Sequence, residues 1–186
     1  MENKKTIGQS IWELVLFVFI AVIVILPFRI FIAQPFIVSG SSMVPTFENG
    51  QYLIVDELSY KISTPKRDDV VVFKYPNDTT KYFIKRIIGL PGETVDVTEN
   101  DVTITNKEHP DGFKLDQPFV KNIGNSTTHF QLKDDEYFVM GDNRPNSYDS
   151  RNWGPVAKKL LMGKPFIRLF PFSKINILPG SYKQAE

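Results

Sequence analysis

The sequence contains no cysteine and only two histidines, His109 and His129. The absence of cysteine excludes disulfide bonds, thiolate nucleophiles, iron–sulfur clusters and cysteine-based zinc sites. Two histidines argue against a metal site built from several imidazoles. They also disfavour a Ser–His triad, because His109 lies in a turn-rich sequence and His129 in a strand-like one.

A charge excess is also missing, since 22 Lys and Arg balance 21 Asp and Glu for a net charge of +1. Nucleic-acid binders normally carry a clear basic excess, so the composition argues against a nucleic-acid partner. The Gly-x-Ser-x-Gly and Gly-x-x-x-x-Gly-Lys motifs are both absent. A Ser-x-x-Lys match at 63–66 contains a proline and has no Lys-Thr-Gly partner, which argues against a penicillin-recognising fold.

One long apolar segment, residues 11–33, is interrupted only by Glu13, Pro27 and Arg29. As a helix it would be roughly 35 Å long, enough to cross a hydrocarbon core about 30 Å thick. The segment has no polar face, so we predict a transmembrane helix in preference to a surface helix or a buried core helix. It exceeds the apolar core of a cleaved signal peptide, and no clean small-x-small site follows it, which favours a retained anchor.

The charges around this segment indicate its orientation. Lys4 and Lys5 precede it and Arg29 lies near its far end, so the positive-inside rule places the N-terminus in the cytoplasm. We therefore predict a cytoplasmic N-terminus at 1–10, a single-pass membrane anchor at 11–33 and an extracytoplasmic domain at 34–186.

The rest of the chain has the pattern of β structure. Short runs rich in β-branched and aromatic residues alternate with turn signals. The expected strands are 51–55, 70–75, 82–89, 94–97, 102–105, 128–132, 137–140 and 166–170. Residues 157–162 are expected to form one or two helical turns. The predicted fold class is mostly β: one N-terminal transmembrane helix followed by a folded β-sheet or barrel-like domain.

Two segments have compositions that suit a plain loop as well as a site. Residues 39–46, SGSSMVPT, follow the apolar run directly. An ordinary turn explains them, but a nucleophilic hydroxyl here would face the membrane surface. Residues 141–151, GDNRPNSYDSR, suit a solvated loop or an ordered brace of an active site. Within them Asp149 and Arg151 would share a face of an extended backbone and could pair.

The third segment, YFIKRIIG at 82–89, places cations among apolar residues. With a period of two, Phe83, Lys85 and Ile87 share one face, and residues 84, 86 and 88 share the other. Because neither face is simply polar, at least one cation has apolar neighbours. It belongs either to an edge strand whose long side chains reach water or to a site with a desolvated lysine. A lysine neutral near pH 7 to 8 is a competent general base.

Together these segments resemble the bacterial type I signal peptidases, a family of membrane-bound Ser/Lys endopeptidases. SMVPT at 42–46 is similar to the nucleophile box and RDDVVVF at 67–73 to a structural box of that family. KRIIGLPG at 85–92 is similar to the general-base box, and 141–151 to the last box. The order, the spacing and the preceding anchor agree with the compact single-anchor members over roughly residues 8–180.

The resemblance implies a serine endopeptidase of largely β fold that removes signal peptides from exported preproteins after small residues, through an acyl-enzyme. Ser42 would be the nucleophile and also the backbone oxyanion donor, and Lys85 would be the general base. Ser147 would hydrogen-bond the lysine amine, and the Asp149–Arg151 ion pair would brace the site. Substrate would contact six further positions: Phe36, Val38, Gly40, Met43, Phe83 and Ile84.

The same resemblance implies no metal or organic cofactor. The partners would be secreted preproteins and the lipid bilayer, with the secretion translocon nearby and no nucleic acid. Two residues depart from the family pattern: Gly40 replaces a serine that donates to the oxyanion in some members, and Asp68 replaces a glycine. If position 68 needs a positive φ, aspartate costs about 1 kcal/mol there. Two other interpretations remain open, a self-cleaving Ser/Lys repressor relative and a non-catalytic anchored β-domain.

Overall fold

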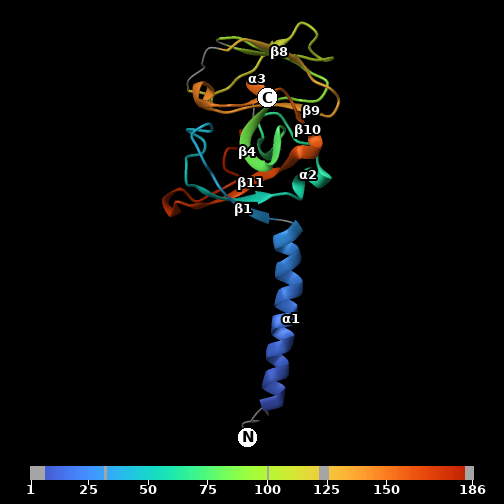
Figure 1. Ribbon diagram of the computed structural model, residues 1–186, viewed down its shortest axis with the longest axis vertical. Helices are drawn as coiled ribbons and strands as arrows, with labels where there is room; N and C mark the ends of the chain where they lie inside the picture. Colours follow the sequence, from blue (N-terminus) through green and yellow to red (C-terminus); the bar gives the residue numbers. More distant parts are fainter. Residues whose placement is uncertain (1–6, 32, 100, 122–125, 183–186) are drawn as a thin grey trace.

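The computed structural model describes residues 7–31, 33–99, 101–121 and 126–182. A long helix, α1 (Ile7–Phe31), extends away from a folded body built mostly of β-strands (Figure 1). The prediction of a mostly β domain is therefore confirmed for this body. Residues 1–6 of the predicted cytoplasmic segment lie outside the described residues.

Helix α1 begins four residues before the predicted span of 11–33 and ends two residues before its end. Ala33 is the first residue of strand β1 (Ala33–Ile37), where it pairs with Asp56. In the ranges that the structure describes, no helix has the length and apolar character needed to cross a membrane.

The other elements of the body are short, apart from two long strands, β4 and β11. In chain order they are β2 (Tyr52–Asp56), α2 (Ser59–Ile62), β3 (Val70–Tyr75), β4 (Asp78–Gly89), β5 (Thr94–Val97), β6 (Val102–Thr105), β7 (Phe113–Lys114), β8 (Thr128–Gln131), β9 (Glu136–Met140), the 3₁₀ helix η1 (Arg144–Asn146), α3 (Ser150–Trp153), β10 (Val156–Ala157), η2 (Lys158–Leu160), β11 (Leu161–Phe170), η3 (Phe172–Lys174) and β12 (Asn176–Ile177).

The large sheet has the strand order β1-β2-β11-β3-β4-β9-β10, with β12 beside β11. Strand β11 pairs with β3 near its start and with β2 further along, and register shifts interrupt both pairings. Such irregularities bend a strand and increase its twist. The end strands β1 and β10 do not pair with each other among the described residues, so the sheet is folded but open. The barrel-like alternative is therefore not formed.

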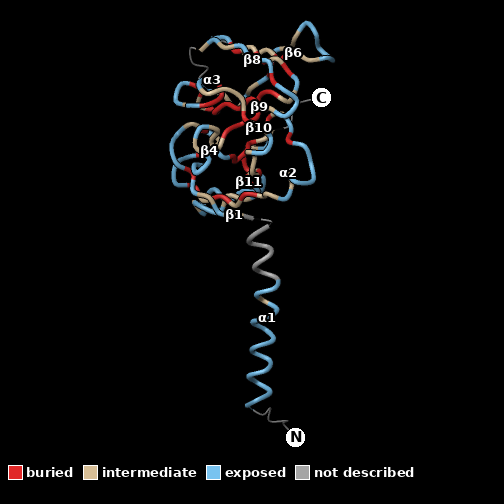
Figure 2. Tube along the Cα trace, turned by 45° about the vertical axis from the view of Figure 1, so that its right-hand side comes forward, coloured by how far each residue is buried: buried red, intermediate tan, exposed pale blue. Residues whose placement is uncertain are grey.

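A small sheet, in the order β7-β6-β5-β8, covers the end of the body opposite α1 (Figure 1). Its inward side chains pack on residues of β4 and β9 in a core cluster that is almost fully buried. Figure 2 colours the trace around β9 as buried. This cluster comprises Ile88, Val95, Val97, Val102, Ile104, Leu115, Leu132, Phe138 and Met140. The alternation of apolar Val and Ile with polar Thr and Asp in β5 and β6 produces this arrangement, because it gives each strand one apolar face and one polar face.

The expected strands 70–75, 94–97 and 102–105 match the structure residue for residue. The strand expected at 166–170 begins earlier, at Leu161, and the one expected at 82–89 begins at Asp78. The helical turns expected at 157–162 are reduced to η2, because strands β10 and β11 occupy the flanking residues.

Candidate active site

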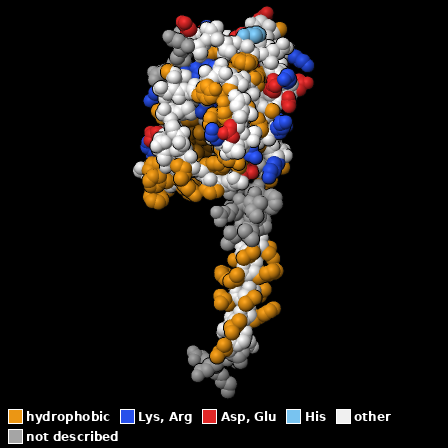
Figure 3. Space-filling view, viewed as in Figure 1, with side chains coloured by type: hydrophobic (Ala, Val, Ile, Leu, Met, Phe, Trp, Pro, Cys, Tyr) orange, Lys and Arg blue, Asp and Glu red, His pale blue; other side chains and the backbone are white. Residues whose placement is uncertain are grey.

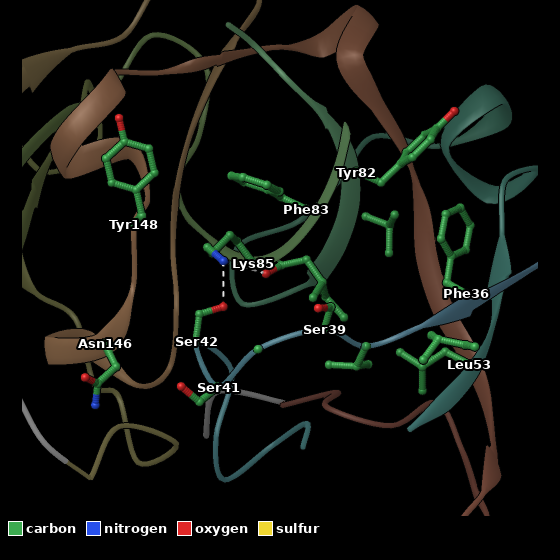
Figure 4. Close-up of a pocket in the computed structure, with 15 residues that line it drawn as sticks. Phe36, Ser39, Ser41, Ser42, Leu53, Tyr82, Phe83, Lys85, Asn146 and Tyr148 are labelled. Atoms are coloured by element: carbon green, nitrogen blue, oxygen red, sulfur yellow. Dashed lines mark hydrogen bonds between the residues drawn. The ribbon is translucent and has the colours of Figure 1, made fainter. Parts of the chain in front are cut away.

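The side chains of Ser42 and Lys85 meet at one end of a cleft between β1 and β4 (Figure 4). Ser42 lies in a turn just beyond β1, where the N–H of Val44 donates to the carbonyl of Ser41 at 3.2 Å. Lys85 Nζ donates to Ser42 Oγ at 2.6 Å and to the carbonyl of Ile84 at 3.1 Å. The two predicted dyad residues are therefore in direct hydrogen-bond contact.

Strand β4 buries both of its adjacent cations. It pairs with β3 up to Arg86 and with β9 from Arg86 onward, so among the described strands only its last residues have a partner on both sides. Lys85 is 5% exposed and Arg86 is 1% exposed, on opposite faces of the strand. The alternative of an edge strand whose cations reach water is therefore wrong.

Burial lowers the pKa of Lys85 from the usual 10.5 to about 8, because desolvation disfavours the ammonium form. The carboxylates of Asp149 and Asp142 oppose this shift, and the guanidinium of Arg151 adds to it. The sequence pattern predicted the apolar surroundings of a cation on this strand. A lysine of this pKa has a substantial neutral fraction near pH 8, as a general base requires.

Arg86 and Asp142 form a buried ion pair on the other face of β4. The two guanidinium nitrogens Nε and Nη2 of Arg86 donate to the Asp142 carboxylate at 2.9 and 2.7 Å. Nη1 donates to the backbone carbonyls of Asp68 and Gly180 at 2.7 and 2.8 Å. The hydroxyl of Thr46 also donates to Asp142, at 2.5 Å. This network joins β4, the turn that carries Ser42 and the loop that follows β9.

Sequence reasoning did not assign this network, although it placed at least one of Lys85 and Arg86 among apolar neighbours. Asp68, whose backbone carbonyl accepts from Arg86, has a φ of +67°. Position 68 does adopt the positive φ considered above, a conformation that aspartate tolerates better than most residues.

Asp149 and Arg151 do form an ion pair, but in a helical turn and not on an extended strand. Asp149 is the N-cap of α3, and its carboxylate accepts from Arg151 Nε and Nη2, both at 2.8 Å. Asp149 Oδ2 also accepts from the backbone N–H of Gly141 at 3.0 Å. Because Arg151 Nη2 donates in addition to the carbonyl of Arg144 at 2.7 Å, the pair holds both ends of the 141–151 segment together.

Ser147 differs from the expectation. Its hydroxyl is buried and has no hydrogen-bond partner among the described residues, so it does not hydrogen-bond Lys85 in this structure. It packs against Gly141, where an added Cβ would overlap both Ser147 Oγ and the carbonyl oxygen of Ser42. The segment therefore lies directly on the nucleophile turn, and the N–H of Asn143 donates to the Ser42 carbonyl at 3.0 Å.

The cleft encloses a cavity of about 420 Å³. Most of the expected substrate-contact residues line it, namely Phe36, Val38, Gly40, Phe83 and Ile84. Met43 does not line it: its side chain is buried in the core cluster that includes Phe47, because the turn after Ser42 directs it inward. Sequence reasoning missed Tyr82, Asn146 and Tyr148, which also line the cavity (Figure 4).

This arrangement suits acyl transfer. A hydroxyl in contact with an amine of lowered pKa is the minimal form of an activated nucleophile. Among the described residues, no group of three or more His, Asp or Glu side chains is placed to hold a metal ion.

Comparison with known proteins gives consistent matches. Residues 11–170 match the family model described as signal peptidase, peptidase S26. A probable signal peptidase I-2 from Synechocystis is 35% identical and the match covers 95% of this chain and 82% of that protein. The signal peptidase I of Leptolyngbya laminosa is 36% identical, with 98% and 86% covered.

Two further matches come from Bacillus and Enterococcus. The signal peptidase I of Bacillus caldolyticus is 36% identical, with 84% of this chain and 90% of that protein covered. A crystal structure of a signal peptidase I from Enterococcus faecalis covers 55% of this chain and 97% of its own, with 31% identity and a TM-score of 0.45. The family match spans most of the chain, and the sequence relatives are similar over nearly their whole lengths. The chain therefore belongs to the signal peptidase family, peptidase S26.

Proposed function

We propose that this chain is a serine endopeptidase that removes N-terminal signal peptides from exported preproteins, with Ser42 as nucleophile and Lys85 as general base. The observation that carries the roles of these two residues is the 2.6 Å contact between Ser42 Oγ and the buried amine of Lys85. Family membership supports the reaction class. The mechanism needs no metal or organic cofactor.

In the proposed reaction, neutral Lys85 takes the proton of Ser42 as Oγ forms a bond to the scissile carbonyl carbon. The negative charge on the carbonyl oxygen is stabilised by the backbone N–H of Ser42. The tetrahedral intermediate collapses to an ester, and the departing amine of the mature protein receives the proton from Lys85. Lys85 then deprotonates a water molecule that hydrolyses the ester, which releases the signal peptide and restores Ser42.

The strand edges around the cleft support binding of an extended substrate. Strand β1 is the end strand of the sheet, and among the described strands residues 78–85 of β4 pair only with β3. A peptide lying between these two edges would gain main-chain hydrogen bonds on both sides. Phe36 from β1 and Tyr82 from β4 meet edge-to-face across the cleft, with ring centroids 5.4 Å apart. This contact narrows the cleft at the end away from Ser42, which favours small substrate side chains there (Figure 4).

We also propose that the apolar segment 11–33, which continues beyond the residues whose side chains the structure describes, anchors the protein in the membrane. The N-terminus would be cytoplasmic and the β-rich domain would lie on the outer face, near the secretion translocon. The apolar residues of α1 support this, since Leu14, Phe17 and Phe19 are all more than 60% exposed. Apolar side chains on the α1 side of the body support it too (Figure 3). These include Ile37, Phe170, Phe172, Ile175 and Ile177.

Protease added outside intact cells should digest the β-rich domain if this orientation is correct. As a control, a cytoplasmic marker protein should resist the protease in intact cells and be digested once the cells are permeabilised. Full protection of the domain in intact cells would contradict the orientation without affecting the proposed reaction.

The reaction itself is tested by incubating the detergent-solubilised full chain with a preprotein. The expected result is one new N-terminus, directly after a small residue, identified by mass spectrometry. A matched preprotein with a bulky residue at that position should remain uncut. If the first substrate also remains intact across pH 7 to 9, the chain is not a signal peptidase.

A further inference from the structure

The backbone just before Ser42 is hydrogen-bonded by the side chain of Asn49, at a position where a neighbouring strand would otherwise supply a backbone acceptor. The β1–β2 pairing continues past Ile37, because the N–H of Val38 donates to the carbonyl of Gln51 at 2.9 Å and the N–H of Gly50 donates to the carbonyl of Val38 at 2.8 Å. One step further along, the N–H of Gly40 donates to the side-chain oxygen Oδ1 of Asn49, also at 2.9 Å. The Asn49 side chain thus adds one rung to the ladder.

The position of Asn49 follows from a tight turn. The N–H of Gln51 donates to the carbonyl of Glu48 at 3.3 Å, and Gly50 has a φ of +82°. A positive φ at the third residue of such a turn is typical of type II turns and suits glycine. The turn places Asn49 at its corner, from which the side chain reaches the opposite segment. The side-chain oxygen of an asparagine amide or an aspartate carboxylate can accept from a backbone N–H as a backbone carbonyl does.

Gly40 is the residue that most needs such a restraint. It is exposed, has a φ of +92° and lies two residues before the nucleophile. Glycine has the widest choice of backbone conformations, so an unrestrained glycine here would let the end of the cleft wall move. Residues 38–42 line the cavity, and their displacement would move Ser42 relative to a bound carbonyl.

We propose that Asn49 is a positioning residue for the signal-peptide cleavage reaction, which acts by fixing Gly40 and with it the wall of the cleft that leads to Ser42. This inference rests on the proposed function. Asn49 itself contacts neither Ser42 nor Lys85 by any hydrogen bond in the structure. Because its Oδ1 occupies the Gly40 N–H, that N–H is directed to the protein and not to the substrate.

The acceptor oxygen is the part of Asn49 that matters. Asn49→Asp retains an acceptor for the Gly40 N–H, whereas Asn49→Leu has a similar size and no acceptor. Glu48→Gln is a control in the same turn, since it weakens only an exposed ion pair with Lys174. None of the three changes touches the Ser42–Lys85 contact, so the pH midpoint of kcat/KM should be the same in all of them.

The experiment measures kcat and KM on a peptide substrate for the detergent-solubilised full chain and the three variants. Asn49→Leu should lower kcat about tenfold, within the loss that a shift of about 1 Å can cause, with a smaller change in KM. Asn49→Asp should restore kcat to within about twofold, and Glu48→Gln should match the wild type. The melting temperature of each variant should lie well above the assay temperature, so that all the rates compared are those of folded protein.

The outcomes separate this inference from the proposed function. If the wild type cleaves and Asn49→Leu cleaves at the same rate, Asn49 has no positioning role and the peptidase function stands. If Asn49→Asp is as impaired as Asn49→Leu, the acceptor oxygen is not the cause and the inference fails. If the wild type does not cleave at all, the proposed function fails instead.

Discussion

Replacing Ser42 with alanine should abolish cleavage of a preprotein, with a loss of about 10⁴-fold or more in kcat. The reason is geometric: Ser42 carries the hydroxyl that contacts the lowered-pKa amine of Lys85, at 2.6 Å. Alanine removes the only atom that forms the ester in the proposed reaction. Folding should be preserved, because the turn around residue 42 is held by backbone hydrogen bonds from Val44, Phe47 and Asn143.

The measurement is single-turnover cleavage of a preprotein, with substrate binding followed separately. Ser42→Ala should still bind the preprotein, since the cleft walls are unchanged. Ser41→Ala is a matched control, because it removes a neighbouring hydroxyl that is not in contact with Lys85. Equal activity of wild type and Ser42→Ala would show that another residue is the nucleophile.

Replacing Lys85 with methionine should also have a large effect. It should lower the activity and raise the stability of the folded protein at pH 7. General-base catalysis typically contributes 10²- to 10⁴-fold, so kcat should fall by about 10³-fold. Lys85→Arg should fall by a similar factor, because arginine stays protonated throughout the accessible pH range. Wild-type kcat/KM should rise with pH and level off above about 8, where Lys85 becomes neutral.

The stability of Lys85→Met should exceed that of the wild type at pH 7. The folded-state pKa of Lys85 is about 8 and its unfolded value is near 10.5, so below pH 8 the folded protein carries a desolvated ammonium. This costs roughly 3 kcal/mol, an order-of-magnitude figure. Between pH 8 and 10.5 only the unfolded chain binds the proton, so wild-type stability rises with pH there and the advantage of the variant fades.

Denaturant unfolding of the two proteins at pH 7 and pH 10 measures this difference. A methionine variant that is less stable than the wild type at pH 7 would show that Lys85 is not destabilised by burial. Retention of full activity by Lys85→Arg would contradict the general-base role itself. A gain in stability with a loss of activity would be the usual trade-off at an active site.

The parts of the fold that followed from the sequence are those with a strong local pattern. Strands 70–75, 94–97 and 102–105 alternate clearly or run apolar between turn residues, and they were predicted to the residue. Strand β1 was missed because it is short, contains Pro35 and follows an apolar helix without a turn signal. Its only sequence signal is the loss of uniform apolarity after residue 33.

The site was predictable only in part. Alternation along β4 placed cations among apolar residues, which anticipates the lowered pKa of Lys85. The contact between Ser42 and Lys85 followed from family resemblance alone, because no local rule joins residues that far apart in the chain. The pairing of Arg86 with Asp142 was missed for the same reason, since these residues are also far apart in the chain. The Ser147 hydroxyl lies beside Gly141 and not on the lysine, a detail set by tertiary packing that no sequence pattern encodes.

One acceptor of the buried Arg86 is the carbonyl of Gly180, which is synthesised after both proposed catalytic residues. Arg86 donates to this carbonyl, and an added Cβ at position 180 would press against Phe47 and Val70, so the segment fits closely behind the site. Synthesis runs from the N-terminus, so the nucleophile turn and β4 exist well before residue 180. A chain interrupted earlier would hold both reacting side chains with one acceptor of Arg86 missing. The support behind the catalytic centre is therefore complete only once residue 180 has been synthesised and packed.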